Sequence, residues 1–190
     1  MVYNIASQMN MNISQSKFVV DTNVLYWMFY GNCTYSNEKR QKMYPNALID
    51  LKLKNNSLYT PATCLFELFS IIEKNEYRVY CAQQGLSEKY FKLKDYRNLP
   101  EERERVAKVI DITYKNIKSF LKIIEQTITK EQLTNMAEQF GAHVLDVYDR
   151  ALVDFCVANG IQNIVTDDQD YRSANKQLNI FTANGNYFKS

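Results

Sequence analysis

The sequence predicts an α/β protein built around a mostly parallel sheet. Short apolar runs of strand length recur along the chain, and longer segments with apolar residues at intervals of three and four lie between them. Strands that alternate with helices in this way usually pair in parallel, because each helix carries the chain back along the sheet. The 190 residues fit a single domain, and 46% of them are hydrophobic, which is enough for a core.

Four of the apolar runs are predicted strands, and six other segments are predicted helices. The strands are Lys17–Val20, Ser57–Thr60, Asn163–Thr166 and Leu178–Thr182. The helices are Asn23–Phe29, Glu38–Lys54, Ala62–Tyr80, Pro100–Ile124, Lys130–Phe140 and Asp149–Asn159. Proline opens the fourth helix and Gly160 follows the last one, as is usual at these two ends of a helix. Residues 1–16 are expected to form a polar leader before the first strand.

The composition restricts where the protein can work. The formal net charge of +2 neither demands nor excludes a polyanionic partner, since a basic patch can sit within a balanced total. No apolar stretch approaches the roughly 18 residues of a membrane helix, and the N-terminus lacks the pattern of a secretory signal. The four cysteines are scattered without paired spacing, which favours free thiols over a zinc site. We expect a cytoplasmic protein that does not bind a membrane.

Acidic side chains are the candidates for chemistry, because the sequence contains only one histidine, His143. Four acids fall at strand ends or helix starts: Asp21 after the first strand, Glu67 in the helix after the second, Asp149 at the start of the last helix, and Asp168 after the third strand. In an open α/β sheet these positions meet at the edge formed by the carboxyl ends of the strands. We therefore expect the four carboxylates in one site.

Each of these acids also has a structural explanation. Asp149 could be a helix N-cap, and Asp168 or Asp170 could be turn residues. Glu67 is harder to explain in this way, because it interrupts the apolar segment CLFELFSII of a helix that should be largely buried. A buried glutamate needs a partner. Few basic residues lie nearby in the sequence, so a cation is the natural candidate.

Converging carboxylates would repel one another unless a divalent ion neutralised them. Oxygen ligands without histidine or cysteine favour Mg²⁺ or Mn²⁺. Such ions can hold a phosphate oxygen, activate a water molecule and stabilise a leaving oxygen. A site of this kind is suited to the hydrolysis of phosphodiester bonds.

Four sequence blocks together resemble the signature blocks of PIN-domain nucleases, and in particular the VapC-type toxin ribonucleases of VapBC toxin–antitoxin systems. The blocks are VVDTNVL, TPATCLFEL, DRALVDFCVANG and IVTDDQDY, and the resemblance covers residues 17–72 and 145–182. Each block alone is a weak signal, whereas four blocks in the correct order are quite specific.

The resemblance implies a three-layer α/β/α fold and cleavage of single-stranded RNA that depends on Mg²⁺ or Mn²⁺. It implies a metal site and catalytic centre made of Asp21, Glu67, Asp149 and Asp168. Asn23 would orient the first aspartate, Thr166 would support the edge of the sheet, and Asp170 would be a peripheral acid. In this family homodimers are common, and toxins are commonly neutralised by a small antitoxin protein that covers the site.

Two features depart from the family pattern. Compact members are shorter, and here residues 75–139 form an enlarged helical segment, whose simplest role is packing rather than a substrate clamp or a dimer surface. Asp154 stands where the third block usually has a small residue, and about 140° of helical rotation from Asp149 directs it away from the metal face. Asp146 competes with Asp149 as the third acid, and the spacing to Gly160 favours Asp149.

Basic residues beside the acids could contact an RNA backbone. Arg150 follows Asp149 and Arg172 lies two residues after Asp170, so these arginines are the preferred candidates. Further basic residues could contribute or could simply be solvated: Lys39, Arg40, Lys42, Lys89, Lys92 and Lys94. The segments KYFKLK and YRVY interleave aromatic rings with cations, a combination that can stack bases and neutralise phosphates.

The preferred hypothesis is a metal-dependent endoribonuclease, with the toxin of a toxin–antitoxin pair as its nearest type. The alternative is a non-catalytic PIN-like module that binds RNA or protein, which is favoured only if the acids fail to converge. A phosphatase of the haloacid-dehalogenase type is disfavoured, because DTNVL lacks the second aspartate two residues after the first.

Overall fold

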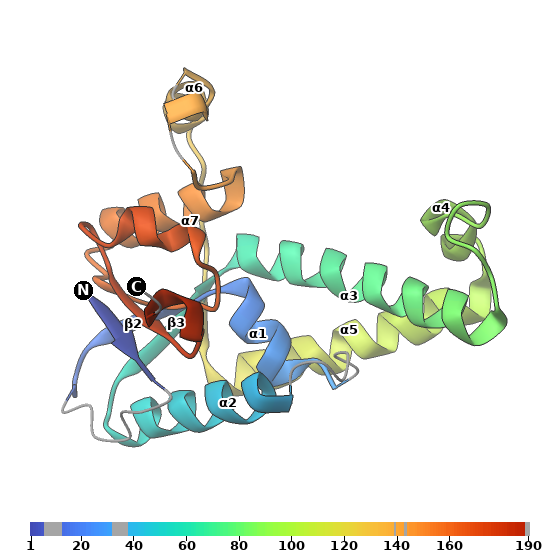
Figure 1. Ribbon diagram of the computed structural model, residues 1–190, viewed down its shortest axis with the longest axis horizontal. Coiled ribbons are helices and arrows are strands. Elements are labelled where there is room, and N and C mark those ends of the chain that lie inside the picture. The colour runs from blue at the N-terminus through green and yellow to red at the C-terminus, as the bar shows by residue number, and fades with distance from the viewer. Residues whose placement is uncertain (6–12, 32–37, 139, 143, 189–190) are drawn as a thin grey trace.

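The computed structural model describes residues 1–5, 13–31, 38–138, 140–142 and 144–188 (Figure 1). Within these residues the centre is a single sheet of six parallel strands in the order β1-β6-β5-β2-β3-β4. The strands are β1 (Val2–Asn4), β2 (Lys17–Val20), β3 (Ser57–Pro61), β4 (Lys122–Ile124), β5 (Asn163–Val165) and β6 (Asn179–Thr182). The parallel sheet predicted from the sequence is confirmed.

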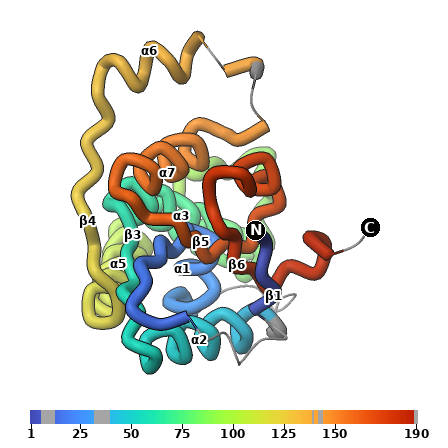
Figure 2. Tube along the Cα trace, turned by 90° about the vertical axis from the view of Figure 1, so that its left-hand side faces the viewer, coloured from blue at the N-terminus to red at the C-terminus, as the bar shows by residue number. Residues whose placement is uncertain are grey.

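Helices cover both faces of this sheet, as the predicted three-layer α/β/α fold requires. Figure 2 shows α7 on one side of the strands and α1 and α2 on the other. The α-helices are α1 (Thr22–Phe29), α2 (Glu38–Leu53), α3 (Ala62–Gln84), α4 (Leu93–Arg97), α5 (Pro100–Phe120), α6 (Lys130–Glu138) and α7 (Val147–Ala158). Short 3-10 helices are η2 (Phe140–Ala142), η3 (Asp170–Ala174) and η4 (Gly185–Phe188). Across the described residues, no helix is both long and apolar enough to cross a membrane.

The main core lies between the sheet and these helices. Phe18, Val19 and Val20 of β2 are fully buried, and so are Ile164 and Val165 of β5. Consecutive buried residues are expected in parallel strands that carry helices on both faces. Since β2 lies between β5 and β3, its carboxyl end opens at the middle of the sheet edge.

Beyond the sheet, α3 and α5 continue side by side as an arm that carries α4 near its far end (Figure 1). A second apolar cluster holds this arm together and consists of Tyr77, Cys81, Tyr96 and Val106. The family resemblance gives no template for this segment, which falls within the enlarged region predicted at 75–139. In the structure this region contains the second half of α3 and the whole of α4 and α5, followed by β4 and α6.

The expected polar leader is wrong at its beginning, because Val2–Asn4 form β1 at the edge of the sheet. β1 pairs with β6, and the ring of Tyr3 stacks on Phe181 with 4.6 Å between the ring centroids. A strand of three residues is too short to show a period, so no strand pattern was visible there. Residues 6–12 of the expected leader lie outside the described residues.

The helix predicted over Pro100–Ile124 ends earlier, at Phe120. The backbone of Leu121 is extended, with φ −131° and ψ 164°, and Lys122–Ile124 then form β4 beside β3. Isoleucines at the end of this segment fit helical spacing as well as a strand, so the apolar pattern could not separate the two. The segment between the predicted helices Ala62–Tyr80 and Pro100–Ile124 contains α4, which was not predicted. The helix predicted over Lys130–Phe140 is present as α6, and residue 139 lies outside the described residues.

Candidate active site

Asp21 lies directly after β2, at the middle of the sheet edge. It is the N-cap of α1, and its Oδ1 accepts a hydrogen bond from the backbone N–H of Thr22 at 2.7 Å. Its Oδ2 accepts a hydrogen bond from the hydroxyl of Thr166 at 2.7 Å, from the end of β5. Asp21 is only 4% exposed. Burial raises the pKa of Asp21 to about 7, although both hydrogen bonds oppose the rise.

Glu67 lies in the second turn of α3 and is joined to the same strand end. The hydroxyl of Thr22 donates to Oε2 of Glu67 at 2.6 Å, so one residue links Glu67 to Asp21. Glu67 is half-buried. Burial raises its pKa, and the charges of Asp146 and Asp168 add to the rise, while Lys74 opposes it weakly.

The third acid comes from the start of α7. The helix begins at Val147, and its N-cap is Asp146, whose Oδ1 accepts from the backbone N–H of Asp149 at 2.9 Å. The N-cap is therefore three residues before Asp149, which was considered for that position, and the helix starts two residues earlier than predicted. Asp149 lies in the first turn and is half-buried. Burial raises the pKa of Asp149 to about 8, with repulsion by Asp21 as a further cause.

Asp168 follows β5 and completes the group. Its backbone N–H donates to the hydroxyl of Thr166 at 3.0 Å, and its Oδ1 accepts from the backbone N–H of Asp170 at 3.0 Å. The hydroxyl of Thr166 therefore joins Asp168 to Asp21, to which it donates a hydrogen bond. The charge of Asp168 also contributes to the raised pKa values of the other three acids. The structure thus brings the four predicted acids to one edge of the sheet. Asp170 is exposed beside them.

These acids fit a divalent cation in their chemistry, but they do not form a closed binding site. Within the described residues, no three acidic, histidine or cysteine side chains lie close enough together to hold a metal ion by themselves. In the same part of the chain, none of the four acids has a lysine or arginine as an ion-pair partner. Carboxylates that are buried together without a cation repel each other. Mg²⁺ commonly keeps several water molecules and binds one or two carboxylates directly, so an open group of acids suits it.

Tyr171 of η3 is a buried residue at this site whose role was not predicted. Its side chain is fully buried, and within the described residues its hydroxyl has no hydrogen-bond partner of standard geometry. The hydroxyl is nevertheless close enough to Asp149 to lower the pKa of that carboxyl group. A buried hydroxyl without a partner usually marks a place where water or an ion completes the polar contacts. Nothing in the sequence block DDQDY distinguishes this tyrosine from a core residue.

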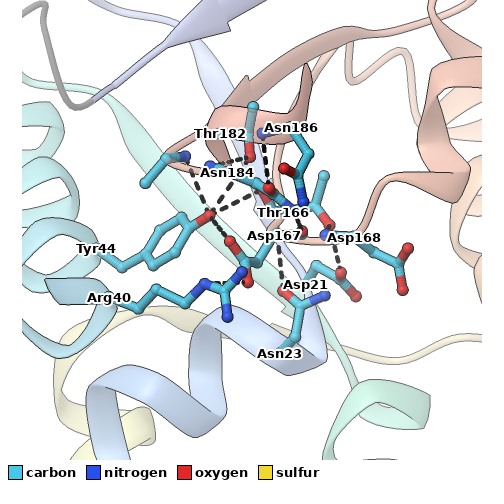
Figure 3. Close-up of polar contacts among 11 residues, drawn as sticks. Asp21, Asn23, Arg40, Tyr44, Thr166, Asp167, Asp168, Thr182, Asn184 and Asn186 are labelled. Atoms are coloured by element: carbon cyan, nitrogen blue, oxygen red, sulfur yellow. Dashed lines mark hydrogen bonds and ion pairs between the residues drawn. The ribbon is translucent and has the colours of Figure 1, made fainter. Parts of the chain in front are cut away.

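Asp167 stands next to Asp168 in the chain, but its carboxylate points the other way (Figure 3). The hydroxyl of Tyr44 donates to Oδ1 of Asp167 at 2.7 Å, and Arg40 pairs with Oδ2 at 2.7 Å. Burial raises the pKa of Asp167, and both partners oppose the rise. Arg40, considered above as an RNA contact, therefore has a partner inside the fold. The side chain of Lys39 lies outside the described residues.

Three side chains from two stretches of the chain hold the backbone of Asp167 and Asp168. Asn23 was expected to orient the first aspartate of the site, and its Oδ1 in fact accepts from the backbone N–H of Asp167 at 3.0 Å. Asn184 donates to the carbonyl of Asp167 at 2.7 Å, and the hydroxyl of Tyr187 donates to the carbonyl of Asp168. These bonds fix the strand end and therefore the direction in which Asp168 leaves it.

The two arginines preferred as RNA contacts already have partners within the protein. Arg150 pairs with Asp154 at 3.1 Å, one turn further along α7. Arg172 donates to the backbone carbonyl of Asn186, and its guanidinium lies over the ring of Tyr187 at 5.3 Å from the ring centre. An RNA contact by either arginine would compete with these interactions.

Comparisons with known proteins agree with this fold. The chain is similar to a solved structure described as the crystal structure of VapBC2 from Rickettsia felis bound to a DNA fragment from their promoter. The match has 17% sequence identity and a TM-score of 0.50, and it covers 87% of this chain and 98% of that one. A search among curated proteins gave no match. The family model described as PIN domain matches residues 18–177, a range that contains all four acids, and the chain therefore belongs to the PIN domain family.

Proposed function

We propose that this protein is a metal-dependent endoribonuclease that hydrolyses phosphodiester bonds of single-stranded RNA. The observation that carries the proposal is the convergence of four carboxylates at the carboxyl edge of a PIN-domain sheet, from Asp21, Glu67, Asp149 and Asp168. The raised pKa values of Asp21, Glu67 and Asp149, and the lack of a basic ion-pair partner for any of the four acids among the described residues, leave a cation as the group that would stabilise them as anions.

The four acids would hold Mg²⁺ or Mn²⁺, with Asp170 as a peripheral member. Such an ion, when bound, polarises a phosphate oxygen and lowers the pKa of a bound water molecule. The protein supplies the positions: Thr166 and Thr22 fix the carboxylates of Asp21 and Glu67 by hydrogen bonds. Since the sequence has a single histidine, a histidine pair cannot act as general acid and base. Hydrolysis by water should therefore leave a 5′-phosphate and a 3′-hydroxyl.

We further propose that the protein is the toxin of a toxin–antitoxin pair. The structure of VapBC2 cited above supports this proposal, because its fold is similar to that of this chain. A cytoplasmic homodimer and a small antitoxin protein that covers the acidic edge belong to the same proposal. A short gene next to that of this protein, whose product restores growth on co-expression, would support it.

Cleavage assays with labelled single-stranded RNA test the enzymatic proposal. We expect cleavage with Mg²⁺ or Mn²⁺, none in EDTA, and none by the Asp21→Asn variant. Asp154→Asn is the matched control, because Asp154 lies on α7 and pairs with Arg150 instead of joining the acids. Cleavage that survives EDTA, or products that end in a 2′,3′-cyclic phosphate, would contradict the proposal.

The second candidate is a non-catalytic PIN-like module that binds RNA or protein. One observation favours it: in the described part of the chain, no group of three potential ligands is close enough to hold a metal ion. A titration with Mn²⁺ separates the two candidates. Saturable Mn²⁺ binding that is lost in Glu67→Gln supports the nuclease, and the absence of binding supports the module.

A further inference from the structure

Exposed aromatic rings border the acidic edge on two helices. Phe66 of α3 is 71% exposed and Tyr148 of α7 is 58% exposed. Phe66 directly precedes Glu67, and Tyr148 directly precedes Asp149. Single exposed apolar residues are ordinary on protein surfaces. Two aromatic rings beside two acids of one site are a more specific arrangement, and packing within the chain does not explain it.

The two rings lie near the starts of two helices that are joined to each other. Gln126 accepts a hydrogen bond from the hydroxyl of Thr63 in the first turn of α3 and donates one to the backbone carbonyl of Ala151 on α7 at 2.9 Å. Successive residues of an α-helix are rotated by about 100°, so each ring leaves its helix beside the neighbouring acid instead of pointing with it. The α7 border continues in further exposed apolar side chains: Phe140, Val144 and Val147.

Charge alone does not attract a nucleic acid to this edge. The acids repel phosphate groups except where a cation is bound, and the nearest arginines, Arg150 and Arg172, already interact within the protein. Groups of another kind can add favourable contacts. Aromatic faces can provide them, since every base has a face that stacks on a ring.

We propose that Phe66 and Tyr148 stack bases of single-stranded RNA on the two sides of the phosphate group at the acidic site. The inference rests on the proposed function and deepens it, because it names the residues that select for unpaired strands. Bases in a duplex are paired and stacked on each other, so they cannot reach rings on the protein surface, whereas bases of a single strand can.

Equilibrium binding of a short fluorescent single-stranded RNA in Mg²⁺ tests this proposal. The full chain carries Asp21→Asn throughout, so that binding is measured without cleavage. We expect Phe66→Ala and Tyr148→Ala each to raise the Kd about tenfold. Phe66→Trp and Tyr148→Phe should keep the Kd of the parent, because a ring remains. Both side chains are exposed, so thermal unfolding should be the same in all variants.

Leu53→Ala is the control. Leu53 is 77% exposed at the end of α2, and β3 begins at Ser57, so Leu53 lies near the amino ends of the strands, opposite to the edge that carries the acids. Its removal should leave the Kd unchanged. In parallel, a blunt RNA duplex of the same sequence should bind equally well to the parent and to the two alanine variants.

Three results would overturn the proposal. They are an unchanged Kd for single-stranded RNA in both alanine variants, an equal loss of affinity for the duplex, and a changed oligomeric state with unchanged RNA affinity. The last would assign the rings to a protein interface. Binding and cleavage can fail separately: cleavage with an unchanged Kd overturns only the stacking, whereas the expected rise in Kd in a protein that does not cleave overturns only the nuclease.

Discussion

Two groups of carboxylates in this molecule have opposite surroundings. On the arm, Glu73 accepts hydrogen bonds from Arg97 and Arg103. Glu76, fully buried on the same helix, accepts from Arg105 and from the hydroxyl of Tyr30. At the sheet edge, Asp21 and Glu67 have only hydroxyl and backbone donors as their hydrogen-bond partners in the described residues.

The pKa values follow this difference. Hydrogen bonds from Arg97 lower the pKa of Glu73, whereas burial raises the pKa of Asp21 to about 7 and that of Asp149 to about 8. Glu73 and Glu76 on the arm have a structural role, because the arginines that pair with them neutralise their charges. The edge acids destabilise the fold as long as they are charged together. Proteins retain such groups chiefly at functional sites, where a ligand or a cation supplies the missing charge.

The largest effect should separate two glutamates of α3. Glu67→Gln should lower the rate of RNA cleavage by about 10³-fold, because it removes a carboxylate that would hold the divalent ion, whose charge would stabilise the transition state. Glu73→Gln, less than two turns further along the helix, should leave that rate unchanged. Single-turnover cleavage under saturating Mg²⁺ measures both variants. If Glu67→Gln and Glu73→Gln lower the cleavage rate equally, the acidic edge is not what determines activity.

The same helix offers the reverse comparison in stability. Glu76→Ala should lower the free energy of unfolding by about 3 kcal/mol, since it leaves Arg105 without its buried partner. Glu67→Gln should not lower it, because no ion pair is lost. Urea unfolding followed by circular dichroism measures both. If Glu67→Gln proves the more destabilising change, the edge acids are structural and the distinction between the two regions fails.

Stability should respond to pH in opposite directions in the two regions. The folded pKa values of Asp21 and Asp149 are raised above their ordinary value of 3.8, so the folded protein binds more protons than the unfolded chain between those values. Without a divalent ion, stability should therefore fall as pH rises through about 7 to 8. The lowered pKa of Glu73 acts oppositely, and its stabilising effect is lost as pH falls.

Thermal unfolding without a divalent ion measures this response. We expect the melting temperature to be about 5 °C lower near pH 8.5 than near pH 5.5. Asp149→Asn should flatten the curve because one of the two acids no longer titrates, and added Mn²⁺ should stabilise more at the higher pH. If the melting temperature instead rises from pH 5.5 to 8.5 in the parent protein and in Asp149→Asn, the acids at the sheet edge do not repel one another as proposed.

The positions of the four acids could be predicted because they depend on topology. An apolar run that ends in Asp21, and another that ends two residues before Asp168, deliver both residues to the same edge once the strands are parallel. The exact start of α7 could not be predicted, because Asp146 and Asp149 are both suitable N-caps in sequence. The three-residue strands β1 and β4 were missed for a similar reason: pairing with a neighbour, and not local pattern, determines them.

Long-range partners explain the rest of what the sequence could not reveal. The exposure of Phe66 was hidden, because the apolar segment CLFELFSII suggests burial for all its large residues, and which side faces solvent depends on how α3 packs. Likewise, the roles of Asp167 and Asp168 look interchangeable in IVTDDQDY. Only the fold brings Tyr44, more than a hundred residues earlier in the chain, to the first of them.

Asp167 and Asp168 are neighbours in the chain, but only Asp167 has an arginine as its ion-pair partner in the described residues. Asp168→Asn should slow cleavage and should keep or slightly raise the free energy of unfolding, because repulsion among the acids falls. Asp167→Asn should lower the free energy of unfolding by about 1 kcal/mol, because the partly exposed Arg40 loses its ion pair. The loss is small because the hydroxyl of Tyr44 can still donate a hydrogen bond to the amide oxygen. Cleavage should then persist in Asp167→Asn, because Asn23, Asn184 and Tyr187 still hold the backbone from which Asp168 projects. Unfolding curves and cleavage rates of the two variants measure both effects, and a loss of cleavage in Asp167→Asn at unchanged stability would move Asp167 into the catalytic group.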